Sequence, residues 1–146
     1  MVNRKLHPKK FFTKEEKERI VEAIRAAEKK TSAEIRVYLE NRPKEDSMTR
    51  ARKVFEKLGM ARTRHRNGVL IYFSLKEQAF AILGDQGIHE KAGSGFWQAA
   101  VEKMQERFLQ NDFAGGLEDG IQSLGEKLTR YFPREADDTN ELPDGL

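Results

Sequence analysis

Residues 67–90, NGVLIYFSLKEQAFAILGDQGIHE, decide the fold and indicate where a functional site would lie. Two apolar runs, 68–74 and 79–83, are separated by a short polar turn, which is typical of a β-hairpin. The second run ends in a Gly-Asp-Gln-Gly loop at 84–87, and glycine lets a backbone turn tightly or approach another group closely. Two acids and a histidine follow the run, and carboxylates bind hard cations or transfer protons. The hairpin therefore predicts a site at the end of its second strand, but it names no reaction.

The length and composition indicate a single domain. The chain has 146 residues, of which 38% are hydrophobic, so it is long enough for one packed core and too short for two typical domains. It has no cysteine, which excludes disulfide and thiolate chemistry. No apolar run has the length of a membrane span or signal peptide, and we therefore expect a soluble, cytoplasmic protein without an integral membrane segment. We divide the chain into a basic segment (1–11), a folded domain (12–132) and an acidic tail (133–146).

The net charge of +3 hides a strong asymmetry between the two halves of the chain. Residues 1–66 carry 20 Lys and Arg against 10 Asp and Glu, whereas residues 67–146 carry 7 against 14. Many of the basic residues are interleaved with glutamates in a helical pattern, which is typical of a solvated helix face. No motif of interleaved basic and aromatic residues accompanies them, so nucleic-acid binding is disfavoured.

Hydrophobic periodicity predicts helices before, between and after the strands. Apolar residues recur at helical spacing in four segments, and the aromatic and methionine residues within them are assigned to packing. The helices are expected at 13–30, 46–59, 96–108 and 112–132, with Thr13, Asp46 or Ser47, and Asp112 as N-terminal caps.

The strand pattern predicts the topology of the sheet. Residues 33–40 alternate between apolar and polar side chains, as a strand with one buried face does. Because a helix separates this strand from 68–74, a right-handed crossover should make the two strands parallel, and 79–83 should return antiparallel. The expected fold class is α/β, an αβα sandwich with a small mixed sheet of three or four strands flanked by helices.

This topology gathers polar residues at the edge where the first two strands begin and the third ends. Oxygen donors suited to Ca²⁺ or Mg²⁺ are expected there from Glu34, Asn67, Asp85 and Glu90. If the first two strands were antiparallel, Glu34 would be replaced at this edge by Glu40, Asn41, Glu45 and Asp46. The structural alternative is that Asp85 caps the turn or a following helix, while Glu90 lies in solvent.

Arginines at the same edge suit phosphate chemistry. Arg62, Arg64 and Arg66 precede the second strand and are expected to neutralise the charge of a phosphomonoester beside the cation. The alternative is that these arginines are solvated, and neither His65 nor His89 has a partner that defines a catalytic role. The chain lacks a P-loop, a dinucleotide-binding fingerprint and a His-Glu-x-x-His motif, which disfavours nucleotide hydrolysis and zinc proteolysis.

Three segments together resemble the TPM domain family: TSAEIRV at 31–37, RNGVL at 66–70 and GDQGI at 84–88. The resemblance runs from about residue 12 to residue 131. It implies an αβα domain with an acidic cleft that binds divalent cations. One chloroplast member of the family is associated with acid phosphatase activity and photosystem repair, and other members look membrane-anchored.

The hairpin entry Asn67-Gly68 matches the family pattern, whereas the loop after the hairpin departs from it. His89 stands at the position of a family glutamate, and Ser94 or Gly95 stands at a later acidic position, so Glu90 would have to compensate. The resemblance favours a divalent-cation-binding domain with weak, acid phosphatase-like phosphomonoesterase activity. The competing hypothesis is a noncatalytic interaction or assembly factor for a protein complex, including a membrane-associated one, in which the acidic tail takes part.

Overall fold

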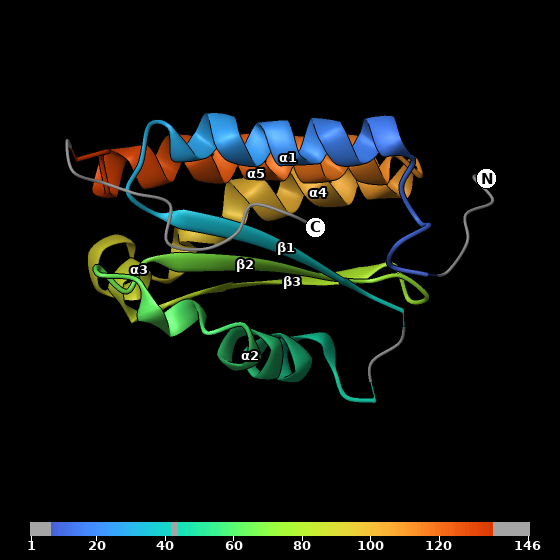
Figure 1. Cartoon of the computed structure of the whole chain (residues 1–146), viewed down its shortest axis with the longest axis horizontal. Helices are drawn as coiled ribbons and strands as arrows, with labels where there is room; N and C mark the ends of the chain where they lie inside the picture. Colours follow the sequence, from blue (N-terminus) through green and yellow to red (C-terminus); the bar gives the residue numbers. More distant parts are fainter. Residues whose placement is uncertain (1–6, 42–43, 136–146) are drawn as a thin grey trace.

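The computed structural model describes residues 7–41 and 44–135, which form a three-stranded sheet between two layers of helices (Figure 1). Helices α1, α4 and α5 cover one face of the sheet, and α2 covers the other (Figure 1). The expected αβα sandwich is confirmed. The elements are α1 (Lys14–Glu28), β1 (Glu34–Glu40), α2 (Ser47–Lys57), the 3₁₀ helix η1 (Met60–Arg62), β2 (Gly68–Ser74), β3 (Ala79–Gly84), α3 (Gln86–Ala92), the 3₁₀ helix η2 (Ser94–Trp97), α4 (Gln98–Leu109) and α5 (Phe113–Tyr131).

The sheet has the strand order β1-β2-β3. β1 and β2 are parallel, and β2 and β3 are antiparallel, as the crossover and hairpin predicted. The register pairs Glu34 with Gly68 and Val69 with Gly84. The starts of β1 and β2 and the end of β3 therefore share one edge, and the antiparallel alternative for the first two strands is wrong.

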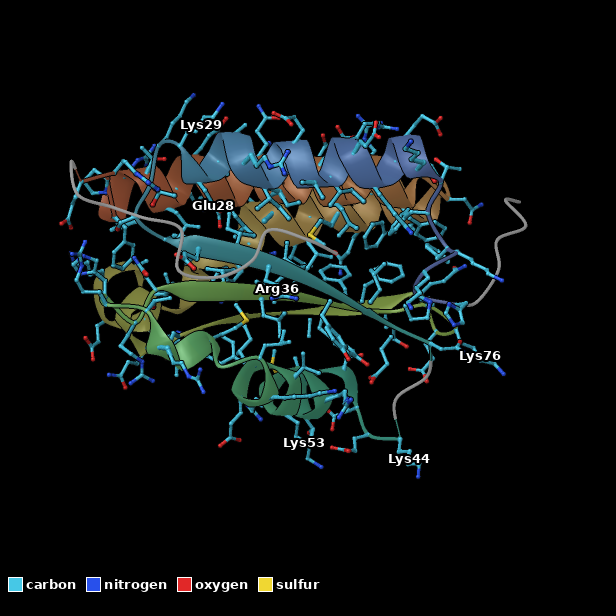
Figure 2. The ribbon with its side chains drawn as sticks, in the orientation of Figure 1. Glu28, Lys29, Arg36, Lys44, Lys53 and Lys76 are labelled. Carbon is cyan, nitrogen blue, oxygen red and sulfur yellow. The ribbon has the colours of Figure 1, made fainter. Side chains whose placement is uncertain are left out.

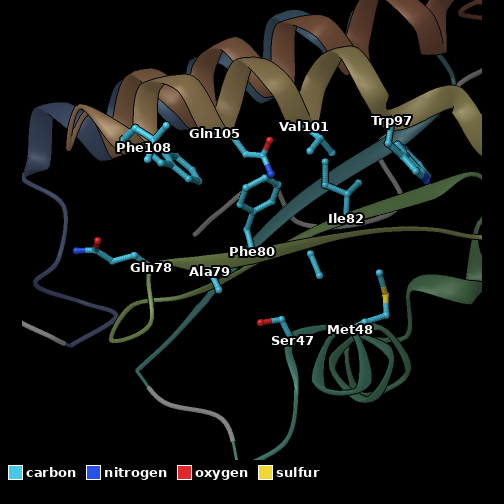
Figure 3. Close-up of a pocket in the computed structure, with 12 residues that line it drawn as sticks. Ser47, Met48, Gln78, Ala79, Phe80, Ile82, Trp97, Val101, Gln105 and Phe108 are labelled. Atoms are coloured by element: carbon cyan, nitrogen blue, oxygen red, sulfur yellow. The ribbon is translucent and has the colours of Figure 1, made fainter.

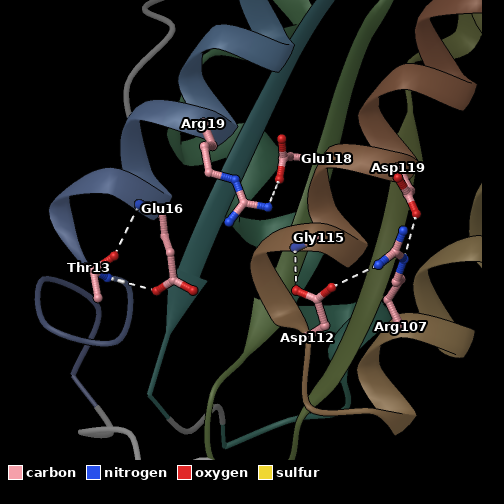
Figure 4. A network of polar contacts seen from close by, with 8 residues as sticks. All are labelled: Thr13, Glu16, Arg19, Arg107, Asp112, Gly115, Glu118 and Asp119. Atoms are coloured by element: carbon pink, nitrogen blue, oxygen red, sulfur yellow. Dashed lines mark hydrogen bonds and ion pairs between the residues drawn. The ribbon is translucent and has the colours of Figure 1, made fainter.

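Side-chain caps fix where the helices begin. Thr13 Oγ1 accepts from the backbone N–H of Glu16 at 3.1 Å, and Glu16 returns a carboxylate to the Thr13 N–H at 2.9 Å (Figure 4). Asp112 caps α5 (Figure 4), and Asp46 rather than Ser47 caps α2. Each cap satisfies a backbone donor that the first turn of a helix leaves without an intrahelical partner.

Two hydrophobic cores hold the layers together. The larger lies between the sheet and α1, α4 and α5, where Phe73 and Phe113 pack with ring centroids 5.7 Å apart. The smaller lies under α2 and includes Val54, Met60 and Tyr72. Charged side chains such as that of Lys53 point outward from the helices (Figure 2), which agrees with a solvated basic face.

Beyond the four expected helices, the structure contains α3 and the short 3₁₀ helices η1 and η2. α3 occupies residues that the main interpretation assigned to a loop after β3, and Asp85 is its N-cap. Within residues 7–41 and 44–135, no helix combines the length and hydrophobicity that a bilayer crossing requires. The acidic tail from residue 136 onward lies outside the described residues.

Candidate functional site

The candidate site lies at the predicted sheet edge, where α3 meets the turn before β2. The Asp85 N–H donates to the Gly68 carbonyl at 2.9 Å, which extends the β2–β3 pairing to the first residue after β3. Gly87 N–H donates to the Arg66 carbonyl, also at 2.9 Å. These backbone hydrogen bonds hold residues 85–87 against the segment that contains Arg66 and Gly68.

Gly87 makes this close approach possible. A Cβ at this position would lie 2.3 Å from the His65 carbonyl oxygen and 2.6 Å from that of Arg66, which is closer than real Cβ contacts. Arg66 itself has a left-handed backbone, with φ of 51°, so the turn reverses direction just before β2. Close packing against His65 and Arg66 therefore requires glycine at position 87.

A bidentate ion pair forms the centre of the site. Arg66 Nε donates to Asp85 Oδ2 at 2.6 Å, and Arg66 Nη2 donates to Oδ1 at 2.9 Å. Asp85 Oδ1 also caps α3 by accepting from the Gln86 N–H at 2.8 Å. The Asp85 side chain is 6% exposed, whereas that of Arg66 is 42% exposed. A buried carboxylate thus faces a cation that solvent reaches.

Neighbouring carboxylates favour the charged form of the Arg66 guanidinium. The hydrogen bonds to Asp85 are the main cause that raises the pKa of Arg66, and the negative charge of Glu90 adds to the effect. Glu90 lies on α3 and is exposed. Asp85 and Glu90 therefore both stabilise positive charge at the position of Arg66.

The other two predicted metal ligands lie apart from this pair. Glu34 is buried and shares the α2 face of the sheet with Asp85, but Gly68 lies between them in the register. The space over Gly68 is filled by Met60, whose carbonyl oxygen and Cε lie 3.0 and 3.6 Å from where a Cβ would stand. Asn67 is buried and donates from Nδ2 to Ser32 Oγ at 3.2 Å.

The predicted four-ligand set is therefore not assembled in this conformation. Among the described residues, no three His, Cys, Asp or Glu side chains gather in a way that would hold a metal ion. The structure also shows that Asp85 caps α3, as the structural alternative expected.

The three predicted phosphate-binding arginines diverge. Arg62 is exposed, and only Arg66 faces Asp85. Arg64 Nη2 lies 3.6 Å from Glu135 Oε2, and His65 Nε2 lies 2.9 Å from Glu135 Oε1. Glu135, at the start of the acidic segment that follows α5, thus contacts the basic turn before β2.

A second polar cluster lies near the opposite end of the parallel strands, where β1 and β2 finish. Arg50 on α2 donates to both carboxylate oxygens of Glu40, from Nε at 2.9 Å and from Nη2 at 2.6 Å. The Tyr72 hydroxyl also donates to Glu40. The hydrogen bonds from Arg50 are the main cause that lowers the pKa of Glu40, whereas burial raises the pKa of Tyr72. This cluster ties α2 to β1 and β2.

The family follows from a match over most of the chain. The family model of the TPM domain matches residues 7–127. The chain belongs to the TPM domain family. This TPM domain superposes on the solution structure of the BA42 protein from the psychrophilic bacterium Bizionia argentinensis with a TM-score of 0.89, at 45% identity, over 93% of this chain and 94% of that chain.

A more distant structure shares the fold of the TPM domain. The N-terminal domain of a protein from P. gingivalis aligns with a TM-score of 0.63 at 18% identity, over 80% of this chain and 76% of that chain. The comparison with curated proteins gives no match. The family and the fold are thus shown, and the chemistry has to be argued from the site.

Proposed function

We propose that this TPM domain binds a divalent cation at the β3–α3 junction, recognises phosphomonoesters through Arg66, and has weak phosphomonoesterase activity. The observation that carries the proposal is the unequal exposure of the Arg66–Asp85 ion pair. Asp85 is held by its backbone contacts, whereas the half-exposed guanidinium can exchange with a dissolved cation.

The residues at the junction fit a divalent cation in chemical type. Asp85 and Glu90 supply carboxylate oxygens, and backbone carbonyls and water would complete the coordination of Ca²⁺ or Mg²⁺. Glu34 and Asn67 would join only if Met60 and the Asn67–Ser32 hydrogen bond rearrange. With so few protein ligands, we expect weak binding, with a Kd of about 10⁻⁴–10⁻³ M.

Arg66 would have two roles in turn. In the free domain its guanidinium neutralises Asp85. Once released, the same planar fork can donate two parallel hydrogen bonds to phosphate oxygens, which matches phosphate better than a lysine would. A bound divalent cation would supply Lewis-acid polarisation of the phosphoryl group and a more acidic water. Arg62 and Arg64 lie four and two residues before Arg66 and would add positive charge near it in the chain.

The first test separates the two roles by NMR titration with Ca²⁺, Mg²⁺ and inorganic phosphate. Asp85→Asn should abolish the cation-induced shifts at residues 84–90. Arg66→Gln should tighten cation binding, because the competing guanidinium is gone, and should weaken phosphate binding. The matched control is Arg107→Gln on α4. The Arg107 side chain is 47% exposed and pairs with Asp119 of α5 at 2.9 Å, so it resembles Arg66 in exposure and pairing but lies away from the site. Shifts scattered over the surface, or equal effects of both arginine variants, would refute the site.

The second test concerns the enzyme claim alone. Hydrolysis of a chromogenic phosphate should depend on Mg²⁺ or Ca²⁺, stop with a chelator, and fall in both Arg66→Gln and Asp85→Asn. If turnover is absent while the titration identifies the site, the domain is a binding module, and the phosphatase part of the proposal is wrong.

A further inference from the structure

β3 is an edge strand without the usual protection against pairing with another chain. The sheet ends at β3, whose sequence is Ala-Phe-Ala-Ile-Leu-Gly. It contains no charged residue and no proline, the two devices that commonly block edge strands. β1, at the other end of the strand order, carries Glu34, Arg36 and Glu40. An uncharged edge is therefore specific to β3.

The backbone of β3 presents hydrogen-bonding groups to this open edge. The Asp85 N–H bonds to Gly68, so the antiparallel alternation directs residues 79, 81, 83 and 85 toward β2. The N–H and C=O groups of Phe80 and Ile82 consequently point away from β2. Only another extended backbone matches donors and acceptors spaced in this way.

A groove of about 820 Å³ runs along this edge (Figure 3). Its walls come from two helices on opposite faces of the sheet. Trp97, Val101 and Phe108 line it on the α4 side, and Met48 lines it on the α2 side (Figure 3). None of its lining residues is charged, although 35% of the chain is. Leu109, which ends the wall, is 86% exposed.

We infer that this groove binds an extended, uncharged and mainly apolar segment of a partner protein, which pairs with β3 as an additional strand. The neutral lining selects against a charged occupant, because a charge placed there would lose water without gaining a partner. This argument disfavours the acidic residues 136–146 and the basic residues 1–6 of the same chain. A second copy would bring an equally concave edge, and two concave surfaces leave the space between them unfilled.

Side chains on both faces of the bound segment would contact the groove. Successive side chains of a strand point in opposite directions, so alternate residues would meet the α4 wall and the α2 wall. Trp97, Val101 and Phe108 give the α4 wall an apolar and aromatic surface, which would favour branched or aromatic residues of the bound segment. Ser47 and Gln105 offer the polar contacts that would fix the register.

The test uses a defined probe, a capped seven-residue peptide of alternating valine and threonine, titrated into the full chain and followed by NMR. We expect saturable shifts of the Phe80 and Ile82 amides. A peptide of the same sequence, N-methylated at alternate residues, should not bind because it cannot form the backbone ladder. Absence of saturable shifts at these amides, or equal binding of the methylated peptide, would overturn the inference.

Charge placed on the groove gives a second readout. Val101→Lys and Leu109→Lys should each weaken peptide binding by about tenfold or more. The highly exposed Leu109 variant keeps the test valid if Val101→Lys unfolds. Val21→Lys, a similarly half-buried valine on α1, is the control and should bind normally. Two results would show that this chain is itself the occupant and would refute a partner segment. One is tighter peptide binding after deletion of residues 1–6 or 136–146, and the other is self-association of the domain that the peptide reverses.

Discussion

Gly87→Ala is the substitution that most directly tests how the site is built. The added methyl group would lie 2.3 and 2.6 Å from the carbonyl oxygens of His65 and Arg66. Neither oxygen belongs to a side chain that can rotate away, so α3 or the turn before β2 must move. Movement also breaks the hydrogen bond from Gly87 N–H to the Arg66 carbonyl.

The expected loss of stability follows from these contacts. Overpacking costs about 1–3 kcal/mol and an unsatisfied buried backbone pair about 1–3 kcal/mol, against about 1 kcal/mol gained from replacing glycine in a helix. The net destabilisation is therefore about 1–5 kcal/mol, or a fall in Tm of roughly 3–15 °C for a domain of this size.

Urea unfolding and calorimetry would measure the effect, with Gly95→Ala as the control. At Gly95 no atom lies within 4 Å of the position that a Cβ would take, and φ is not positive. Its replacement by alanine should therefore leave the stability of the domain unchanged or raise it by up to about 1 kcal/mol. The described packing of α3 against the turn is incorrect if Gly87→Ala is as stable as Gly95→Ala.

Three further predictions concern stability. The pKa of Glu40 is lowered in the folded state, so the ionised carboxylate stabilises the fold above its ordinary pKa of 4.5, and this stabilisation is lost as the pH falls through the lower folded pKa. Urea unfolding between pH 3 and 7 should therefore show a loss of stability on the acid side, and this loss should be smaller in Glu40→Gln. Asp112→Ala removes the cap that accepts from Gly115 N–H at 2.9 Å and should reduce the free energy of unfolding by about 1 kcal/mol, and an unchanged melting temperature would contradict that role. Gly125→Ala would place a methyl 2.7 Å from Ala27 Cβ on α1 and should cost about 1–3 kcal/mol in thermal unfolding, unless α1 and α5 separate more easily than their packing indicates.

The topology of the sheet was predictable because it depends on local pattern and chirality. The apolar runs at 68–74 and 79–83 define a hairpin, and the intervening helix makes β1 and β2 parallel by the right-handed crossover rule. α3 was not predictable in the same way. Its seven residues are too few for a periodic signal, and it forms where Asp85 caps it and Gly87 packs against His65 and Arg66, which come before β2 in the chain.

The sequence predicted which residues lie near the edge but not which ones meet. Strand register determines that Glu34 and Asp85 occupy one face of the sheet. It does not show that Met60 fills the space between them, because η1 is placed by packing under α2. Similarly, the alternating arginines of 62–66 look equivalent in sequence, and the left-handed backbone at Arg66 directs only that one toward Asp85.

The departure of the acidic loop from the family pattern has a structural consequence. His89, at the position where the resemblance implies a glutamate, lies with its ring centroid 6.4 Å from that of Trp97. It therefore adds no carboxylate to the group around Arg66, and Glu90, one residue later on α3, is the acid whose charge acts there. Two carboxylates beside one guanidinium leave a single net negative charge and give a divalent cation few protein ligands. Restoring the acid with His89→Glu should consequently lower the Kd for Ca²⁺ below that of the unmodified domain, and a titration that finds no change would contradict a cation site at the β3–α3 junction.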